Sequence, residues 1–562
     1  MKKKFLSLLL AMLMTAGAIT SCSDPATKEE DVATADTEEA QRVSMTLSLW
    51  LPTGKNTTEE AMQQVSDELN KLTQAKFDTA IELHLIPENE YWDKVYNMST
   101  EIGERIEAQE EAEKQRKKEL KALKAQGIKI EETETETEAE TEEETIINEL
   151  GISIKQYPEV GENQMDIFLV QGYENYLDMI DNDYIQQLDQ ELNSTSKILK
   201  QYIYPTYFDL ANQFGIYAVP NNHPVGEYEY LLINKEFVDK YDYHIDELTT
   251  FIKCGDFIKD IGNQNLDGVV PLLAPVEAAF MEYWGSEEGE WSLVASQLSN
   301  ATTYSSKASP RSIFANTTYT NTVLLMKELE EMGYVGDGTL EDGEKFAVGI
   351  VKGNPNTLAE YEDEYYSRIY KAPMFTEDDI YGSMFAVSTY SKSLERSMEI
   401  ITYLNTNKQF RTILQYGAQG IHWDYEDDSE ETIEILSNDY QMDLLETGNV
   451  YMTYPGEGRS MDEWEVGKQQ NIDAMCDPYI GFTGHIIAEN KAQIKELDEL
   501  SKIYKEKLDN CSAAEFKDAV NQWKDELKAE EAFTALTDAL NNENSIPAVY
   551  LSWYDQTYPS AS

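Results

Sequence analysis

Val43-Ser-Met-Thr-Leu-Ser-Leu-Trp50 opens the folded part of the chain, and apolar and polar side chains alternate along it. A period of two predicts a β-strand with one buried face. Residues 81–86 and 165–170 are two further short runs that predict strands. Between the first two runs, Thr57 and Glu60 have the spacing of a helix capping box. The apolar positions that follow recur at helical intervals and predict an amphipathic helix: Met62, Val65, Leu69 and Leu72.

This alternation of strands and helices predicts the fold class. A second helix is expected from about residue 90, before the strand at 165–170. Strands that alternate with helices favour an α/β fold with a parallel sheet covered by helices. Ligands of such sheets bind beyond the carboxyl ends of the strands. The residues to inspect first are therefore Trp50, Pro87 with Glu88, and the segment 171–173.

Size and charge exclude several classes of protein. The chain has 562 residues and a formal net charge of −60, from 45 basic and 105 acidic residues. Phosphate recognition needs clustered Lys and Arg, so nucleic acid is not an expected partner, and loose adhesion to anionic lipid is disfavoured. With 41% hydrophobic residues, the chain cannot be disordered throughout.

The N-terminus carries an export signal. Lysines occupy positions 2–4, residues 5–16 are mainly apolar, and Ile19-Thr-Ser-Cys22 follows. A membrane-spanning helix needs about 20 apolar residues, and this run is shorter. The tetrapeptide resembles a bacterial lipobox, which implies cleavage before Cys22 and a diacylglycerol on its thiol. Plain secretion is the alternative. Residues 22–42 then form a lipid-anchored tether, with the protein on the extracytoplasmic face of the cell membrane.

An acidic segment interrupts the pattern of strands and helices. Residues 105–162 contain a Lys/Glu-rich helical stretch and then a run with 9 glutamates in the 14 positions 131–144. Such a run repels itself and buries nothing, so we expect a disordered, solvated insertion that folding does not require. A calcium-binding or partner-docking role is the alternative.

An ordered set of motifs extends over nearly all of residues 43–551. The set consists of the lipobox, Tyr91-Trp-Asp-Lys-Val95, Met165-Asp-Ile-Phe168, Tyr184-Ile-Gln-Gln-Leu-Asp189, Gly215-Ile-Tyr-Ala-Val-Pro220, Tyr230-Leu-Leu-Ile-Asn-Lys-Glu236, Met384-Phe-Ala-Val-Ser388, a helix from Ser393 to Asn405, and Tyr416-Gly-Ala-Gln-Gly-Ile-His-Trp423. In this order it resembles the extracellular solute-binding lipoproteins of bacterial ABC importers for sugars.

The resemblance implies a two-lobed α/β fold with the solute held between the lobes. It implies lobe 1 at 43–227, lobe 2 at 228–387, a return to lobe 1 at 388–455, and C-terminal helices at 456–562 that pack mainly on lobe 2. The chain would leave the first lobe near 223–229 and return near 383–388. The implied partners are a small solute, most simply an oligosaccharide, and ABC permease subunits. We expect a monomer.

Sugar sites combine flat aromatic rings with carboxylates and amides. Aromatic and polar residues near predicted strand ends, turns and loops are the candidates, although each aromatic ring could equally serve packing. They are Trp50, Gln171, Tyr173, Glu174, Glu227, Glu229, Glu277, Trp284, His422 and Trp423.

Catalytic and metal motifs are absent from the sequence. None of the five histidines is four residues from another, and neither a Gly-x-Ser-x-Gly elbow nor a phosphate-binding loop occurs. Asn263-Gln-Asn-Leu-Asp-Gly268 resembles a calcium loop, but Ala274 stands where the bidentate ligand would be. The resemblance to the solute-binding family also implies an acidic pair before Pro271, where this sequence has Val269 and Val270. We expect a binding protein without catalytic residues, metal or cofactor. A secreted carbohydrate hydrolase and a surface adhesin are the alternatives.

Three cysteines remain after the lipobox cysteine: Cys254, Cys476 and Cys511. The sequence allows one disulfide between two of them or buried free thiols.

Overall fold

The structure is a computed structural model, and it describes residues 42–125, 145–147, 153–212, 215–277, 294–296, 310–339, 345–359, 361–476, 480, 490–540 and 542. Two main β-sheets are present among these residues, and each is packed by its own helices. The acidic run at 131–144 lies outside the described residues.

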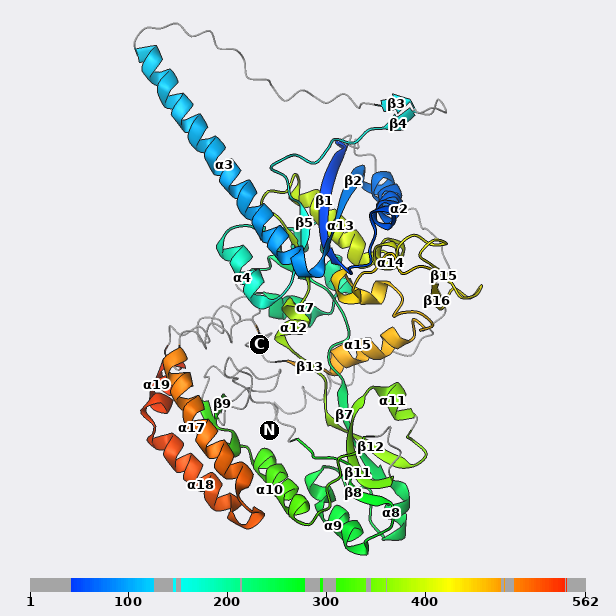
Figure 1. The fold of residues 1–562 in the computed structure, drawn as a ribbon, viewed down its shortest axis with the longest axis vertical. Coiled ribbons are helices and arrows are strands. Elements are labelled where there is room, and N and C mark those ends of the chain that lie inside the picture. The colour runs from blue at the N-terminus through cyan, green and yellow to red at the C-terminus, as the bar shows by residue number, and fades with distance from the viewer. Residues whose placement is uncertain are drawn as a thin grey trace, which may run out of the picture. The chain divides into compact units, whose positions relative to one another are not determined.

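The first sheet has the order β2 (Thr79–Pro87), β1 (Met45–Thr53), β5 (Ile167–Val170), β14 (Met384–Val387) and β6 (Ala218–Pro220) (Figure 1). The first three strands are parallel, which confirms the strands expected from the sequence. The expectation of a parallel sheet is wrong for β14, which runs antiparallel to both of its neighbours. Because Met384 pairs with Val170, the chain re-enters the sheet at the edge where β5 ends, and β14 must run in the opposite direction.

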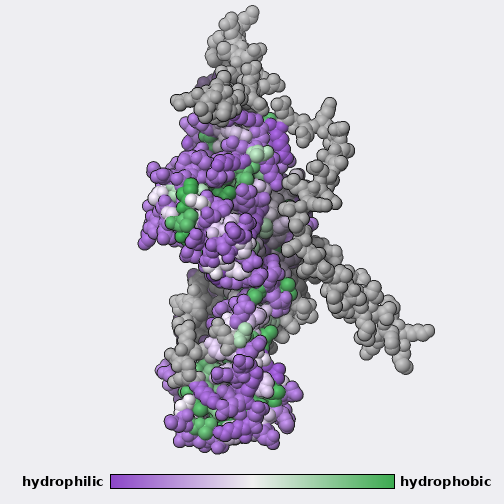
Figure 2. Space-filling model, turned by 90° about the vertical axis from the view of Figure 1, so that its right-hand side faces the viewer, coloured by the Kyte–Doolittle hydropathy of each residue, from purple (hydrophilic) through white to green (hydrophobic). Residues whose placement is uncertain are grey.

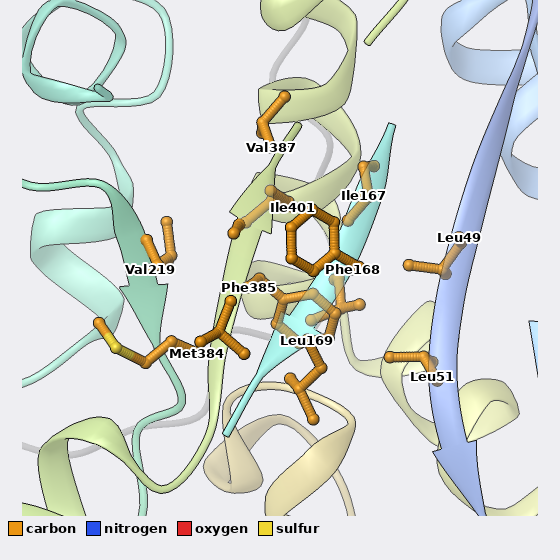
Figure 3. Packing of buried hydrophobic residues seen from close by; sticks show 14 of the residues in the cluster. Leu49, Leu51, Ile167, Phe168, Leu169, Val219, Met384, Phe385, Val387 and Ile401 are labelled. Atoms are coloured by element: carbon orange, nitrogen blue, oxygen red, sulfur yellow. The ribbon is translucent and has the colours of Figure 1, made fainter. Parts of the chain in front are cut away.

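Side chains on both faces of the central strands are buried. Every residue of β5 and β14 is buried, as are Leu47, Leu49 and Leu51 of β1. Figure 3 shows Phe168 and Phe385 between the side chains of Leu49 and Val219, with Ile401 beside them. Burial on both faces explains why the central strands are uniformly apolar, and the helices supply the covering layers.

Helices α2 (Glu59–Phe77) and α3 (Glu88–Ala125) follow β1 and β2, as expected. Val65 and Leu69 of α2 are buried. The cap of α2 is one residue later than predicted: Thr58 accepts the N–H of Ala61, while the Thr57 hydroxyl bonds to the backbone of Gln441. Helix α3 extends beyond the sheet, and its residues 107–119 are exposed.

Helices α13 (Leu394–Thr406) and α14 (Lys408–Tyr416) complete the packing of the first sheet. Both helices contact α2, and α13 also contacts β14. The helix expected between Ser393 and Asn405 is α13, with Ser393 as its cap.

The second sheet has the order β12 (Tyr365–Lys371), β7 (Tyr228–Asn234), β11 (Lys345–Gly353) and β8 (Val269–Leu272). Alternate residues of β7 face two different clusters, with Leu231 and Ile233 in one and Tyr230 and Leu232 in the other. Helices α9 (Gly255–Gln264) and α10 (Thr317–Glu331) pack on this sheet. A second core of this kind, separate from that of the first sheet, defines a second α/β lobe.

Three C-terminal helices pack together and on α10: α17 (Lys491–Asn510), α18 (Ala513–Ala529) and α19 (Glu531–Leu540). Trp523 is fully buried, and its indole N–H donates to the Ser312 hydroxyl over 2.8 Å. Leu497, Tyr504 and Leu508 of α17 are buried at the helical spacing that the sequence predicts. These helices therefore form a hydrophobic cluster of their own on one helix of the second lobe.

Three chain segments connect the two lobes. The segment 221–227 leads from β6 to β7, and the segment 372–383 leads back to β14. Helix α15 (Glu463–Asp473) is the third segment, and it lies in the range 456–562 where the resemblance implied helices, although its connecting role was not predicted. Its Asn471 accepts the N–H of Val225 over 2.9 Å and donates to the carbonyl of His223 over 2.8 Å. The three segments are thus joined by buried hydrogen bonds.

A hydrogen bond joins the first two connecting segments. His223 Nε2 lies 3.3 Å from Asp379 Oδ1, and Tyr207 donates its hydroxyl proton to the His223 carbonyl over 2.8 Å. Burial alone would raise the pKa of Asp379, but hydrogen bonds from His223 and Thr376 lower that pKa overall. The charge of Asp379 is therefore stabilised where the chain passes from one lobe to the other.

Cys254 and Cys511 are free thiols. Burial raises the pKa of Cys254 to about 12, so its thiol stays protonated and unreactive. The side chain of Cys476 lies outside the described residues.

Across the described ranges, no helix has the length and apolar character that crossing a bilayer would require. The surface drawn in Figure 2 is mostly hydrophilic, with hydrophobic residues in small separate groups.

Asp166 holds the start of β5 in place. Its fully buried carboxylate accepts the backbone N–H of Ser48 over 2.9 Å and that of Lys392 over 2.7 Å. The Ser391 hydroxyl donates to it over 2.7 Å and the Gln164 amide over 2.8 Å. One side chain therefore joins β1, β5 and the turn after β14.

We expect Asp166→Ala to destabilise the protein by about 3 kcal/mol, because buried backbone N–H groups lose their acceptor. Urea unfolding monitored by tryptophan fluorescence measures this change. The exposed Asp181, at the end of α4 (Tyr173–Asp181), supplies the control, since Asp181→Ala should change stability by less than about 0.5 kcal/mol. Equal effects of the two substitutions would contradict the role of Asp166.

Candidate functional site

A polar cluster lies at the edge where β5 and β6 end and β14 begins. Gln171 follows β5, Asn221 follows β6, and Ser383 precedes β14. Glu446 comes from the loop 443–448. These four residues are called the edge cluster below. The Gln171 amide donates to Glu446 Oε1 over 2.5 Å, and the Asn221 amide donates to the Ser383 hydroxyl over 2.7 Å. The cluster occupies the position at which α/β sheets bind ligands.

The carbonyls of the loop 443–448 are bound from two sides. Asn221 and Ser383 both donate to the carbonyl of Leu445, over 2.8 and 2.7 Å. Arg411 of α14 donates to two further carbonyls of the loop, that of Leu444 over 2.7 Å and that of Gly448 over 3.3 Å. These bonds fix the backbone on both sides of Glu446.

Arg411 is fully buried, and its guanidinium also donates to Gln415 Oε1 over 3.0 Å. Burial lowers its pKa to about 9, which still leaves the guanidinium charged at neutral pH. Gly448 has φ +108°, and a Cβ there would lie 2.1 Å from Leu404. Both the backbone angle and the close approach therefore require glycine at the end of the loop.

Glu446 is the most perturbed carboxyl of this region. Its residue is 8% exposed. Burial, together with the negative charges of Asp443 and Glu88, raises the pKa of Glu446 to about 7, although the Gln171 hydrogen bond opposes them. Its second carboxyl oxygen has no protein partner within the described part of the chain. Near pH 7 this group can accept or donate a hydrogen bond.

Trp50 lies inside β1 and not after it, so its expected place at the strand end is wrong. The strand continues to Thr53. The Trp50 indole stacks on His84 of β2, with ring centroids 4.2 Å apart and planes 18° apart. Its indole N–H is buried without a partner among the described residues. Burial lowers the pKa of His84, so the stacked imidazole is neutral at pH 7.

Tyr173 and Glu174 open α4, and Gly172 separates Tyr173 from Gln171. Tyr173 is buried and packs edge-on against Tyr381, with ring centroids 5.0 Å apart. Glu174 is exposed. Of the three predicted residues after β5, only Gln171 joins the edge cluster.

Glu227, Glu229 and Glu277 belong to the second lobe or the segment leading to it. Glu227 is exposed, and Glu229 of β7 lies 3.8 Å from Lys371 Nζ. Glu277 is exposed, and its carbonyl accepts the Tyr370 hydroxyl over 2.7 Å. Among the described residues, no hydrogen bond or ion pair connects these three glutamates to the edge cluster.

His422 and Trp423 are buried in a small core of their own. Trp423 packs with Ile433 and Tyr454, and its indole N–H donates to the carbonyl of Gly417 over 2.9 Å. His422 Nδ1 accepts the N–H of Ala418 over 2.9 Å, and burial lowers the pKa of His422. Both side chains are buried and hydrogen-bonded within the protein, so we do not assign them to the edge cluster or to solute binding.

Two predicted residues lie outside the described ranges: Trp284 and the lipidation candidate Cys22. In the segment 263–268, which the sequence likened to a calcium loop, Asn263 Oδ1 accepts the Tyr334 hydroxyl proton over 2.9 Å. Asn265 caps α9 in a left-handed conformation. Within the ranges that the structure describes, no group of three or more His, Cys, Asp or Glu residues is arranged to hold a metal ion.

Sequence reasoning missed Asn221, Ser383, Arg411 and Glu446. Asn221 stood in a turn that the sequence placed at a lobe connection, which is the only signal it carried. Glu446 is 275 residues from the Gln171 that binds it, and nothing in its neighbourhood marks a strand end. Only the folded arrangement brings them together.

Comparison with known proteins supports the fold. No family model matches the sequence. The crystal structure of the N-glycan transport solute binding protein NgtS from Streptococcus pneumoniae aligns with a TM-score of 0.52 at 16% identity, over 92% of this chain and 100% of that one. This likeness confirms the predicted two-lobed α/β fold of solute-binding proteins.

A carbohydrate ABC transporter substrate-binding protein from Streptococcus pneumoniae serotype 4 is 25% identical over 165 residues, which are 28% of this chain. The match spans only 33% of the length of that relative. Both similar proteins are named as binding proteins and not as enzymes.

The pKa of Glu446 predicts a pH-dependent contribution to stability. Its pKa is 4.5 in the unfolded reference and about 7 in the fold, so the folded chain binds more protons between these values and loses stability as the pH rises through them. We expect Glu446→Gln to stabilise the protein by roughly 1–3 kcal/mol at pH 8 and by almost nothing at pH 4.5. Paired melting curves across this range measure the difference.

Glu174→Gln is the control, because Glu174 is exposed. Its melting temperature should follow that of the wild type at every pH. A Glu446→Gln difference that stays constant from pH 4.5 to pH 8 would contradict the assignment.

Proposed function

We propose that the chain is an extracytoplasmic solute-binding protein that captures an oligosaccharide and delivers it to an ABC importer. The observation that carries the proposal is the shared fold, which covers 92% of this chain and 100% of an N-glycan transport solute binding protein. The sequence match to a carbohydrate ABC transporter substrate-binding protein supports the same class of solute.

The edge cluster supplies the chemistry that sugar capture requires. Sugars present hydroxyl groups that donate and accept hydrogen bonds, and Gln171 and Glu446 offer an amide and a carboxyl at the ligand-binding edge of the first sheet. Leu445, 42% exposed, adds an apolar surface next to them for the C–H groups of a sugar ring. We assign the solute contacts of the first lobe to these residues.

Capture needs no change in the solute. A sugar that contacts both lobes favours the closed arrangement by its higher affinity for it, and the closed arrangement is the form that permease subunits would recognise. A diacylglycerol on Cys22 would hold the receptor near the permease, since acyl chains anchor a protein at the membrane surface. Lobe closure, the permease partner and the lipid anchor are all parts of this proposal.

Calorimetric titration with glycans tests the function. The panel contains a high-mannose glycan, a biantennary N-glycan and maltopentaose, and mass spectrometry checks each sugar afterwards. We expect at least one glycan to bind and to be recovered intact. Gln171→Ala should weaken binding at least tenfold, or by about 1.4 kcal/mol, because the amide contact is lost.

The control for this titration is Glu174→Ala, three residues further along the same segment, which should bind like the wild type. The proposal is wrong if none of the glycans binds. It is also wrong if a glycan is hydrolysed during the titration.

A further inference from the structure

Three carboxyl groups converge on the edge cluster. Glu446 belongs to the cluster, Asp443 opens its loop, and Glu88 begins α3 at the end of β2. The negative charges of Asp443 and Glu88 both act on the Glu446 carboxyl. Asp443 and Glu88 are exposed, so their charges face solvent beside the cluster.

One positive charge acts on these carboxyls: that of the buried Arg411, whose pKa the negative charge of Asp443 raises against the effect of burial. Among the described residues, none of the three forms an ion pair. Arg411 lies beneath the loop, fully buried, and its guanidinium donates to the loop carbonyls and to Gln415. Its Nε–H has no partner among the described residues, but the side chain is fully buried and does not reach the surface. Lys55, in the exposed turn after β1, has no described ion pair with the three carboxyls either.

We propose that the edge cluster selects neutral oligosaccharides and rejects anionic ones, with Glu446 as the residue that determines this selectivity. The inference rests on the proposed function and specifies its class of solute. A neutral sugar can donate a hydroxyl proton to the free oxygen of Glu446, while Gln171 holds the other oxygen. A carboxylate or sulfate on the solute would instead meet like charge, while the one nearby guanidinium, that of Arg411, is buried and cannot bind it.

Position strengthens the assignment to Glu446. The loop backbone on both sides of it is fixed by Arg411, Asn221 and Ser383. Its carboxyl also accepts the Gln171 amide, so turning away from an incoming anion would break that hydrogen bond. Asp443 and Glu88 are exposed and can turn their side chains toward water. Glu446 should therefore contribute most of the discrimination.

The test compares two glycans of nearly equal size that differ in charge: a disialylated biantennary N-glycan and the same glycan with its sialic acid carboxyls converted to neutral amides. Calorimetry at pH 8 and low salt gives both dissociation constants for the wild-type full chain. We expect the neutral glycan to bind at least tenfold more tightly. In Glu446→Gln this ratio should fall at least threefold, because the amide keeps the shape of the side chain without its charge.

Asp181→Asn is the matched control, since it removes one negative charge from the exposed end of α4 and should leave the ratio unchanged. Glu88→Gln is a second variant that leaves the buried Glu446 and Gln171 pair intact, and it should narrow the ratio by a smaller factor. It keeps the inference testable if Glu446→Gln fails to fold.

The outcomes separate the two proposals. If both glycans bind equally well, or if Glu446→Gln and Glu88→Gln leave the ratio unchanged, the charge selectivity is wrong while the solute-binding function stands. If neither glycan nor any other member of the neutral panel binds, the proposed function is overturned and the selectivity with it.

Discussion

Satisfying the buried carbonyls of the loop 443–448 is the constraint on which the candidate site depends. The loop can lie against the sheet only if its carbonyls at Leu444, Leu445 and Gly448 find donors, because an unpaired buried carbonyl costs about as much as a lost hydrogen bond. Arg411 serves two of them and Asn221 with Ser383 serve the third. The result places Glu446 in contact with Gln171. Donors from three distant parts of the chain thus create the site.

Much of the fold could be predicted because its signals are local. The alternation in β1 and the helical spacing of Val65 and Leu69 predicted both elements within a few residues. The direction of β14 could not be predicted, because it depends on where the chain returns after building the second sheet. The connecting role of α15 could not be predicted for a similar reason: it depends on the hydrogen bonds that Asn471 makes with Val225 and His223.

The site was harder to predict than the fold. Gln171 was predicted because it follows a strand, and ligands of α/β sheets bind beyond the carboxyl ends of the strands. Trp423 followed no such rule, and its ring fills a local core in which its indole N–H is already bonded. Glu446 carries no local signal, since its unusual environment is created by burial beneath its own loop and by charges from Asp443 and Glu88. Sequence reasoning therefore identified one of the two residues that form the central hydrogen bond.

The most direct test of the central claim is a crystal structure of the protein grown with the neutral glycan that binds it best. The account predicts an intact glycan with a hydroxyl group within hydrogen-bond distance of the Glu446 carboxyl and another polar group near the Gln171 amide. A glycan bound elsewhere on the molecule, or density for cleaved sugar at this edge of the sheet, would contradict it.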